Sequence, residues 1–530
     1  MRINKKNIFF SILSILTITL ISFSYNIESR ALLEATIQSG IIKYPDEFNL
    51  MHVVSINSWS LPIQIISVLV KNGFSTSIIS KMILFISTFM FFVGIYLITK
   101  TLTGSTLLAF LISFLVIFLR KNFGILDYPT MMFSEHTNSL MAQALSTLIF
   151  AFLINSNFKL GFFFSAILLS VHLTIGLWVN FIIFLTLIFK FKIYKNIILN
   201  KKILASIFLG LIITLISFLY SFDQKIVLDS VYDDTAYKTY MEVWEAHRTG
   251  YGLYSDLINY SYIAKTLILI FLIYILLRLE VQKEKINFGI NVLLMNCLLS
   301  LLIYIGYKYF YFLIPDIIIR IMPTRYFLLH SIIGWPIIFS IFYISSKFLF
   351  KKFNFNFKYI YYFFVLILIL NFLQHNSKFI QKYQDIKFNL FTSSKNNKEN
   401  EFWNKIKIIN LNGYLLTSSD VCVKTVAEAK KLVFFCPDNL DYIPYIPSTA
   451  GYTKKIVEDV FDISFGNPKV KHGGGIHVDD LRSSYEKKSY KDWIKLKNEF
   501  NINGLIVPKK WKIDLEVYFF SEIHNFYLIQ

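Results

Sequence analysis

Two adjacent carboxylates, Asp46 and Glu47, lie in a segment that follows the first long apolar run of the chain. A carboxylate in such a loop could act as a general base and take the proton of an acceptor hydroxyl. The alternative is a solvated acidic pair on the surface, since Asp and Glu are mostly exposed in proteins. From the residues alone, both interpretations stay open.

The histidines of the membrane half form a second group of candidate residues. We expect all five in outward loops or at outer helix ends: His52, His136, His172, His247 and His330. An ionisable group at membrane depth suggests a functional site. His136, which precedes an apolar run, and His172, which lies in the middle of a long one, are therefore candidate substrate-binding residues. A hydrogen-bonded structural histidine is the alternative for each.

Aromatic and cationic side chains gather in two further outward segments. Trp244, His247 and Arg248 combine a ring on which a sugar could stack with a guanidinium that binds phosphate through a planar fork. The alternative is a surface helix that packs against the tail of the chain. Arg320 and Arg325 precede a later apolar run. They could bind a lipid phosphate, or they could simply extend to lipid headgroups.

Motifs for several other chemistries are missing from the sequence. It contains no phosphate-binding glycine loop, no zinc-protease motif and no Cys-x-x-Cys pair. His472-Gly-Gly-Gly475 is similar to the oxyanion loop of esterases, but the Gly-x-Ser-x-Gly turn that should accompany it is absent. We therefore expect no cofactor and identify no metal site, with a divalent metal left as an alternative that no motif supports, and an ATP-driven pump is disfavoured.

The composition indicates which elements must position these residues. Of 530 residues, 55% are hydrophobic and only 16% are charged, against about 25% charged in an ordinary soluble domain. The apolar residues form long uncharged runs close to the ~20 residues that a membrane helix needs. Much of the net charge of +19 falls in short loops on one side, as expected for cytoplasmic loops. We infer a polytopic membrane protein with no nucleic-acid partner.

We expect about eleven membrane spans, with the N-terminus in the cytoplasm and the tail outside. Nine are single runs, at residues 8–23, 82–99, 106–119, 139–154, 203–220, 262–277, 288–307, 326–344 and 359–372. Residues 161–189 carry no charge and would form a helix of ~43 Å, too long for a ~30 Å hydrocarbon core. We interpret this region as two short or broken helices that meet at an outward tip near His172.

The chain divides into a membrane domain, residues 1–372, and a C-terminal domain, residues 373–530. The membrane domain carries a large first outer loop, residues 26–81, in which residues 57–69 suit a helix in the membrane interface. The predicted fold class is mainly α, a polytopic membrane helix bundle followed by an extracytoplasmic α/β domain.

The tail has the composition and size of a small α/β domain. Its strand-like runs lie at residues 413–417, 431–435 and 504–507, and its helix-like stretches lie at residues 400–408 and 490–500. Cys422 and Cys436 also lie in the tail. The sequence alone leaves open whether these two cysteines pair.

This plan resembles the GT-C fold family, integral membrane glycosyltransferases that use polyprenyl-phosphate-linked sugars. Members have an acidic residue in a large first outer loop, short or broken spans, and often an extracytoplasmic end domain. The resembling segments are Tyr44-Pro-Asp-Glu47, His172-Leu-Thr-Ile-Gly-Leu-Trp178, Trp244-Glu-Ala-His-Arg248 and Met322-Pro-Thr-Arg325. The similarity of plan covers essentially the whole chain.

The resemblance implies transfer of a sugar, with inversion, from a lipid-linked donor to a glycan, lipid or protein acceptor on the outer face. Asp46 would be the base, with Glu47 as the substitute, and the outer arginines would neutralise the leaving phosphate. A single acidic pair differs from the paired loop carboxylates of metal-dependent oligosaccharyl transferases. The expected location is the bacterial cytoplasmic membrane, with membrane lipids as further partners.

Two other functions are alternatives. A transporter or flippase of lipid-linked saccharides should show paired halves with corresponding broken helices, whereas this sequence has one convincing break. A non-catalytic membrane scaffold would not need acids, histidines and arginines gathered on its outer loops. We therefore predict that Asp46, His172, Arg248 and Arg320 line a single cavity.

Overall fold

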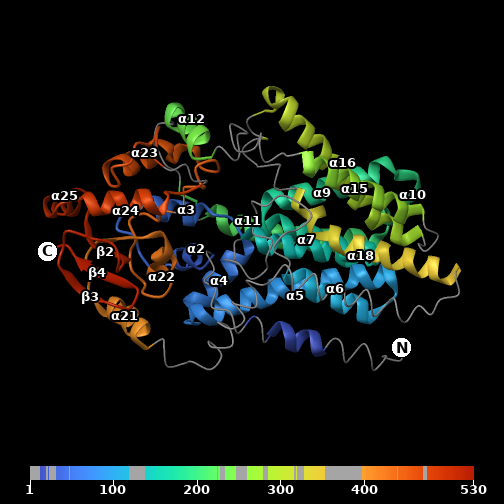
Figure 1. Ribbon diagram of the computed structural model, residues 1–530, viewed down its shortest axis with the longest axis horizontal. Helices are drawn as coiled ribbons and strands as arrows, with labels where there is room; N and C mark the ends of the chain where they lie inside the picture. The colour runs from blue at the N-terminus through green and yellow to red at the C-terminus, as the bar shows by residue number, and fades with distance from the viewer. Residues whose placement is uncertain are drawn as a thin grey trace.

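The protein is mainly helical, with a small mixed sheet near its C-terminus (Figure 1). The computed structural model describes residues 12–19, 22, 31–46, 48–118, 138–223, 225–226, 233–245, 260–278, 284–315, 318, 327–352, 397–437, 440–469 and 474–530. Seven of the sixteen residues of the predicted first span, residues 8–23, lie outside these residues, as do all of the last span, residues 359–372, and the predicted domain boundary near residue 373.

The membrane half is a bundle of apolar helices. In chain order they are α5 (Thr76–Thr103), α6 (Thr106–Phe118), α7 (Asn138–Ile154), α8 (Phe158–Val171), α9 (Leu173–Phe189), α10 (Phe191–Ile198), α11 (Lys201–Asp223), α15 (Tyr260–Arg278), α16 (Glu284–Tyr309) and α18 (Phe327–Lys352). Helix α5 packs against α6, α7 and α18, while α8 packs against α7, α9 and α11.

The length and composition of these helices indicate an integral membrane protein. Within the described part of the chain, three helices could each cross a membrane, and the number rises to five if each of two bent helix pairs is one span. Three further apolar helices are shorter, at Thr106–Val116, Ser139–Ile154 and Phe158–Val171. The membrane character is therefore confirmed, whereas the figure of eleven crossings stays a prediction.

The long uncharged region forms two helices, as predicted. Helix α8 ends and α9 begins at His172, whose extended backbone (φ −157°, ψ 106°) interrupts the helical path. The two helices lie closely together because Gly176 of α9 has no side chain to keep the backbone of Leu169 away. The Asn180 amide of α9 donates a 2.7 Å hydrogen bond to the Ser165 carbonyl of α8.

The first outer loop forms three helices: α2 (Ala31–Gln38), α3 (Leu50–Asn57) and α4 (Leu61–Lys71). Asn49 caps α3 through its side chain, and Pro62 in the first turn of α4 fits a helix N-terminus. Helix α4 matches the helix predicted at residues 57–69, and the chain bends by 115° between α3 and α4.

The tail contains a four-stranded mixed sheet surrounded by helices. The helices are α21 (Asn397–Ile408), α22 (Cys422–Ala427), α23 (Ala450–Asp459), α24 (Val478–Lys487) and α25 (Tyr490–Phe500). The strands are β1 (Tyr414–Thr417), β2 (Ile502–Pro508), β3 (Val517–Phe520) and β4 (His524–Leu528), in the order β1-β2-β4-β3. Strands β1 and β2 are parallel, and the other pairs are antiparallel.

Most of the predicted tail elements are confirmed. Two of the three strand-like runs are β1 and β2, and both helix-like stretches are α21 and α25. The run at residues 431–435 pairs only through the isolated bridge between Leu415 and Val433.

Three segments that are far apart in the sequence share one hydrophobic core, which we call the outer core. Its members include Leu33, Ile37, Leu50 and Met51 of the first loop, Tyr237, Tyr240 and Trp244 of the second loop, and Phe435, Phe461, Tyr485 and Trp493 of the tail. The second loop contributes through α12 (Asp234–Val243), which packs on α23. Full burial of a large apolar side chain contributes about 1.5–3 kcal/mol, so these contacts hold both loops firmly to the tail.

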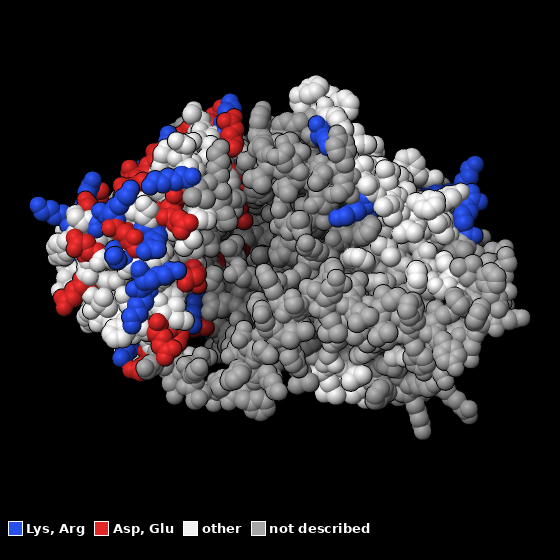
Figure 2. All heavy atoms as spheres, in the orientation of Figure 1, with Lys and Arg blue, Asp and Glu red and all other residues white. Residues whose placement is uncertain are grey.

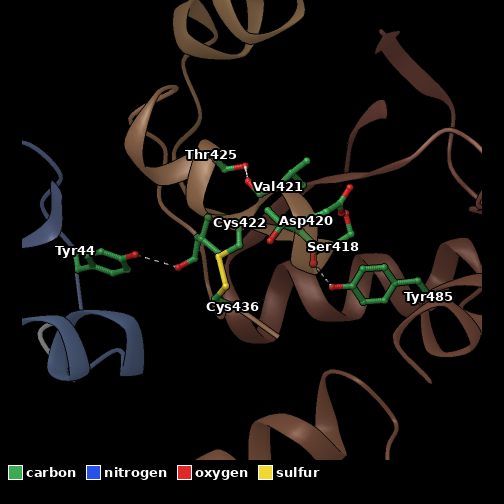
Figure 3. The surroundings of a disulfide bond; sticks show 10 residues. Tyr44, Ser418, Asp420, Val421, Cys422, Thr425, Cys436 and Tyr485 are labelled. Carbon is green, nitrogen blue, oxygen red and sulfur yellow. Dashed lines mark hydrogen bonds between the residues drawn. A yellow bond between two sulfur atoms is a disulfide. The ribbon is translucent and has the colours of Figure 1, made fainter. Parts of the chain in front are cut away.

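A disulfide joins Cys422 of α22 to Cys436, with Cα atoms 5.8 Å apart (Figure 3). Disulfides persist in oxidising compartments and are rare in the cytosol. The bond is consistent with an extracytoplasmic tail, and the shared outer core then places both loops on that side as well.

Candidate functional site

The loop that carries Asp46 is attached to the tail at both of its ends. On one side, the buried Tyr44 hydroxyl donates a hydrogen bond to the Val433 carbonyl, 3.2 Å away. On the other, the Asn49 amide donates to the Phe434 carbonyl, 3.3 Å away. Figure 3 shows the ring of Tyr44 reaching from the first loop toward the tail beside the disulfide. The tail thereby fixes the position of the Asp46 loop.

Asp46 itself is exposed, and its Oδ1 accepts a 2.9 Å hydrogen bond from the Phe48 backbone amide. This local bond holds the carboxylate in a turn of the kind that Asp favours. The carboxylate keeps acceptor capacity for a substrate hydroxyl. Glu47, the substitute base, lies outside the described residues.

Two tyrosines of the tail lie near enough to Asp46 to be affected by its charge. Burial raises the pKa of both Tyr414 and Tyr452, and the negative charge of Asp46 raises each further, while the nearby Asp46 backbone counters part of the rise at Tyr414. Tyr452 is 39% exposed. The Tyr414 side chain is only 5% exposed, and its hydroxyl has no hydrogen-bond partner of good geometry among the described residues. The Tyr414 hydroxyl therefore lies buried beneath the Asp46 loop, and Tyr452 is the tyrosine that a ligand can reach.

The second loop reaches the same corner of the tail through Asp233. Its carboxylate caps α12 by accepting a 2.9 Å hydrogen bond from the Ala236 amide. Gly451, which precedes Tyr452, leaves room for it: a Cβ on Gly451 would lie 3.2 Å from the Asp233 Cβ and 3.5 Å from its Oδ2. Acidic residues of two loops therefore lie near the N-terminal turn of α23.

Trp244 is a core residue in this structure. It is 2% exposed, its ring centroid lies 5.8 Å from that of Phe465, and its indole donates a 2.8 Å hydrogen bond to the Phe465 carbonyl. Its own carbonyl accepts from the Gly474 amide, 3.2 Å away. The segment packs on the tail, which is the alternative that the sequence left open, and the buried ring offers no free face to a sugar.

His172 lies in a polar cluster at the junction of α8 and α9. Its Nε2 is 3.0 Å from the Ser139 hydroxyl of α7, and its Nδ1 is 3.0 Å from the Thr174 hydroxyl. The neighbouring Val171 carbonyl accepts a 3.3 Å hydrogen bond from Ser60, at the start of α4. The first loop thus carries Asp46 before α3 and, after α3, contacts Val171 beside His172. Helix α3 has eight residues, a length of ~12 Å.

The remaining predicted residues are His136, His247, Arg248, Arg320 and Arg325, and they lie outside the described residues. The prediction of a single cavity lined by Asp46, His172, Arg248 and Arg320 therefore stays a prediction.

Polar contacts between the first loop and the bundle were not predicted from the sequence. Gln64 of α4 and Ser217 of α11 exchange two hydrogen bonds, of 2.9 and 2.7 Å, and the Trp59 indole donates to the Ser217 hydroxyl, 3.0 Å away. Within the first loop, Glu34 accepts a 2.8 Å hydrogen bond from Ser58. No motif marks these residues; the one available signal is Glu34, an isolated acid in the otherwise uncharged helix α2.

A partly buried ionic cluster ties together three parts of the tail. The Nε2 of His524 in β4 lies 3.0 Å from Asp420, and its Nδ1 lies 3.4 Å from Glu399 of α21. Burial opposes protonation, but hydrogen bonds to the two carboxylates and their charges outweigh it and raise the pKa of His524 to about 9. At Glu399, hydrogen bonds with His524, Ser521 and Trp403 and the charge of His524 outweigh burial and lower its pKa to about 2.

This cluster does not have the arrangement of a hydrolase triad. The Ser418 hydroxyl donates to Asp420, 2.5 Å away, whereas a nucleophilic serine would be hydrogen-bonded to the histidine. A charged His524 between two carboxylates fits a structural clamp. Within the described residues, no three His, Cys, Asp or Glu side chains are grouped so that they could hold a metal ion.

No protein-family model matches this chain, and no curated protein is significantly similar to it. Its function must therefore be argued from the residues and their geometry.

Proposed function

We propose that the protein is an integral membrane glycosyltransferase that moves a sugar from a polyprenyl-phosphate donor to an acceptor hydroxyl on the extracytoplasmic side. One observation carries the proposal: an exposed carboxylate of the first outer loop, Asp46, is held in place by the tail and lies near two of its tyrosines. That arrangement supplies a positioned base beside an exposed ring that can bind a sugar.

In the proposed reaction, Asp46 takes the proton of the acceptor hydroxyl while the oxygen attacks the anomeric carbon of the donor. The bond from this carbon to the phosphate oxygen breaks, and the phosphate leaves with the electron pair, which inverts the sugar. Because phosphate is a good leaving group, the protein mainly needs to orient the reactants, supply one base and stabilise the departing charge.

We assign the other residues by their chemistry. Tyr452 would bind the acceptor through its exposed ring, and Tyr414, whose hydroxyl is buried, would help to position the Asp46 loop. Arg248, Arg320 and Arg325 would bind the donor phosphate. His136 and His172 would contact the substrate, and Glu47 would be the substitute base.

The proposed topology has eleven crossings of a bacterial cytoplasmic membrane, with the N-terminus in the cytoplasm. Two features support this sidedness: the disulfide of the tail and the outer core that joins the tail to the first and second loops. Segments that share a core must lie on the same side of the membrane.

The test is transfer from a panel of polyprenyl-phosphate sugars by the purified full-length protein in lipid nanodiscs. Asp46→Asn should lose about 10²–10⁴-fold in rate, the usual contribution of a general base, without a change in melting temperature. Asp479→Asn, an exposed carboxylate of α24 with a 74% exposed side chain, is the matched control and should stay active.

Two results would contradict the proposal. Full activity of both Asp46→Asn and Glu47→Gln would remove the assigned base. Movement of the intact lipid-linked saccharide across the membrane, without any transferred product, would instead favour the transporter.

A further inference from the structure

A cluster of lysines marks the end of the bundle that is farthest from the tail. Residues 190–202 contain Lys190, Lys192, Lys195, Lys201 and Lys202 and no acidic residue. Helix α10 lies at this end in Figure 1, and in Figure 2 a group of Lys and Arg side chains appears there with no acidic side chain visible beside it. The tail, by contrast, shows both charges closely mixed (Figure 2).

The chain turns sharply between α9 and α10, where the helix axes differ in direction by 118°. Such an angle is close to perpendicular, so α10 does not continue the path of α9. If α9 crosses the membrane along its normal, α10 is inclined by 28° to the bilayer plane (118° less 90°) and stays near the membrane surface. An orientation of this kind is typical of amphipathic helices in the membrane interface.

One face of α10 is firmly attached to α16. Tyr194 is 4% exposed, its ring centroid lies 4.9 Å from that of Phe288, and its hydroxyl accepts a 2.7 Å hydrogen bond from the Asn291 amide. Lys190 donates to the other end of that amide, also at 2.7 Å. These contacts fix the turn and the direction of α10, so its remaining surface is presented in a defined orientation.

The remaining surface combines cations with apolar side chains. Lys192, Lys195, Lys201 and Lys202 are all exposed, and none of the four forms an ion pair with an acidic residue in the described part of the chain. Beside them are large exposed apolar residues: Phe189 at 72%, Phe191 at 52%, Ile193 at 63% and Leu199 at 67%. Water would be a poor environment for the apolar side chains of this surface, whereas the lysine charges beside them would attract an anionic partner.

We propose that α10 and the first turn of α11 bind anionic phospholipid headgroups. The four free lysines contact headgroup phosphates, and Phe191 and Ile193 insert among the first acyl carbons. Charge complementarity selects this occupant: residues 190–202 carry lysines and no carboxylate, and their exposed apolar side chains need a nonpolar partner at the same depth. The inference does not depend on the proposed glycosyl transfer.

The test uses the purified, delipidated full-length protein in a neutral detergent, titrated with dioleoyl phosphatidylglycerol or dioleoyl phosphatidylcholine. Bound lipids are counted by native mass spectrometry. We expect a preference for phosphatidylglycerol that weakens as salt rises. A lysine near an anionic surface strengthens binding by about 1 kcal/mol, or about fivefold. The change of all four lysines to glutamine should therefore reduce this preference by a large factor, on the order of 10³-fold if the contributions add.

A second variant controls for the loss of charge itself. Lys405, Lys455, Lys491 and Lys495 are exposed lysines of the tail, and their change to glutamine should leave the preference intact. The change of the four α10–α11 lysines to arginine should also preserve it. The melting temperature in phosphatidylcholine confirms that each variant is folded.

The proposal is wrong if the wild-type protein binds both lipids equally. It is also wrong if the α10–α11 glutamine variant keeps the preference, or if the tail variant loses as much of it. A loss in the α10–α11 variant alone supports the proposal.

Discussion

The substitution Gly176→Ala tests the packing that brings α8 and α9 together at His172. An ideal Cβ at Gly176 would lie 2.6 Å from the Leu169 Cα and 2.8 Å from the Leu168 carbonyl carbon. Carbon atoms in ordinary contact are ~3.5–4.0 Å apart, so the two helices would have to separate by about 1 Å. Overpacking of this kind costs about 1–3 kcal/mol. Because the clash is with backbone, no rotation of a side chain relieves it.

A matched control lies in α16. The Cβ of Gly306→Ala would meet no heavy atom within 4 Å among the described residues, so this variant keeps only the gain of about 1 kcal/mol that alanine has over glycine in a helix. Both variants share that gain, so the difference between their unfolding free energies isolates the packing cost, about 1–3 kcal/mol. The assay is thermal unfolding of both purified proteins in the same detergent. If Gly176→Ala were as stable as Gly306→Ala, the close contact between α8 and α9 would be disproved.

Three further predictions concern the tail and its attachment. The pKa of His524 is about 9 in the folded protein and about 6.5 in the unfolded chain. Its protonation should therefore stabilise the tail by up to about 3 kcal/mol below pH 6.5, and this stabilisation should be lost as the pH rises through 9. His524→Gln should remove this pH dependence from melting temperatures measured over a series of pH values. Cys436→Ser removes the disulfide that closes a loop of 14 residues and should lower the free energy of unfolding by about 3 kcal/mol, measured against wild type without reductant. Equal stability of the two proteins would show that the disulfide does not form. Tyr44→Phe removes the hydrogen bond to Val433 and should lower the free energy of unfolding by about 1 kcal/mol. Faster proteolysis within the first loop would show that the loop has detached from the tail.

The sequence was most informative where a pattern is local. A 29-residue apolar run is too long for one span, and the break appears at His172, where the polar residue was noted. In the tail, runs such as residues 504–507 carry the β-branched and aliphatic residues that strands favour. Strands β3 and β4 were missed because polar residues interrupt β4, and because β3 is an edge strand whose exposed residues, such as Phe520, do not alternate clearly with buried ones.

The candidate site was less predictable because it depends on contacts between distant segments. Asp46 was proposed from its place in the first loop, but nothing near it in the sequence shows that Tyr414 and Tyr452 lie close to it. Trp244 shows the opposite problem. Its residue type suits both sugar stacking and a core, and only the surrounding tail residues, such as Phe465, decide that it is buried.

The outer core has a consequence for how the protein is made. Tyr44 and its partner Val433 are 389 residues apart, and a ribosome that adds about 5–20 residues per second needs roughly 20 to 80 s to cover that distance. Throughout this interval α2 and α3 have already been synthesised, while the domain that covers their apolar faces has not. A nascent chain that stops before Val433 leaves its earliest outer helices uncovered, so truncated products should be recognised by quality-control proteases even when every membrane helix has been inserted.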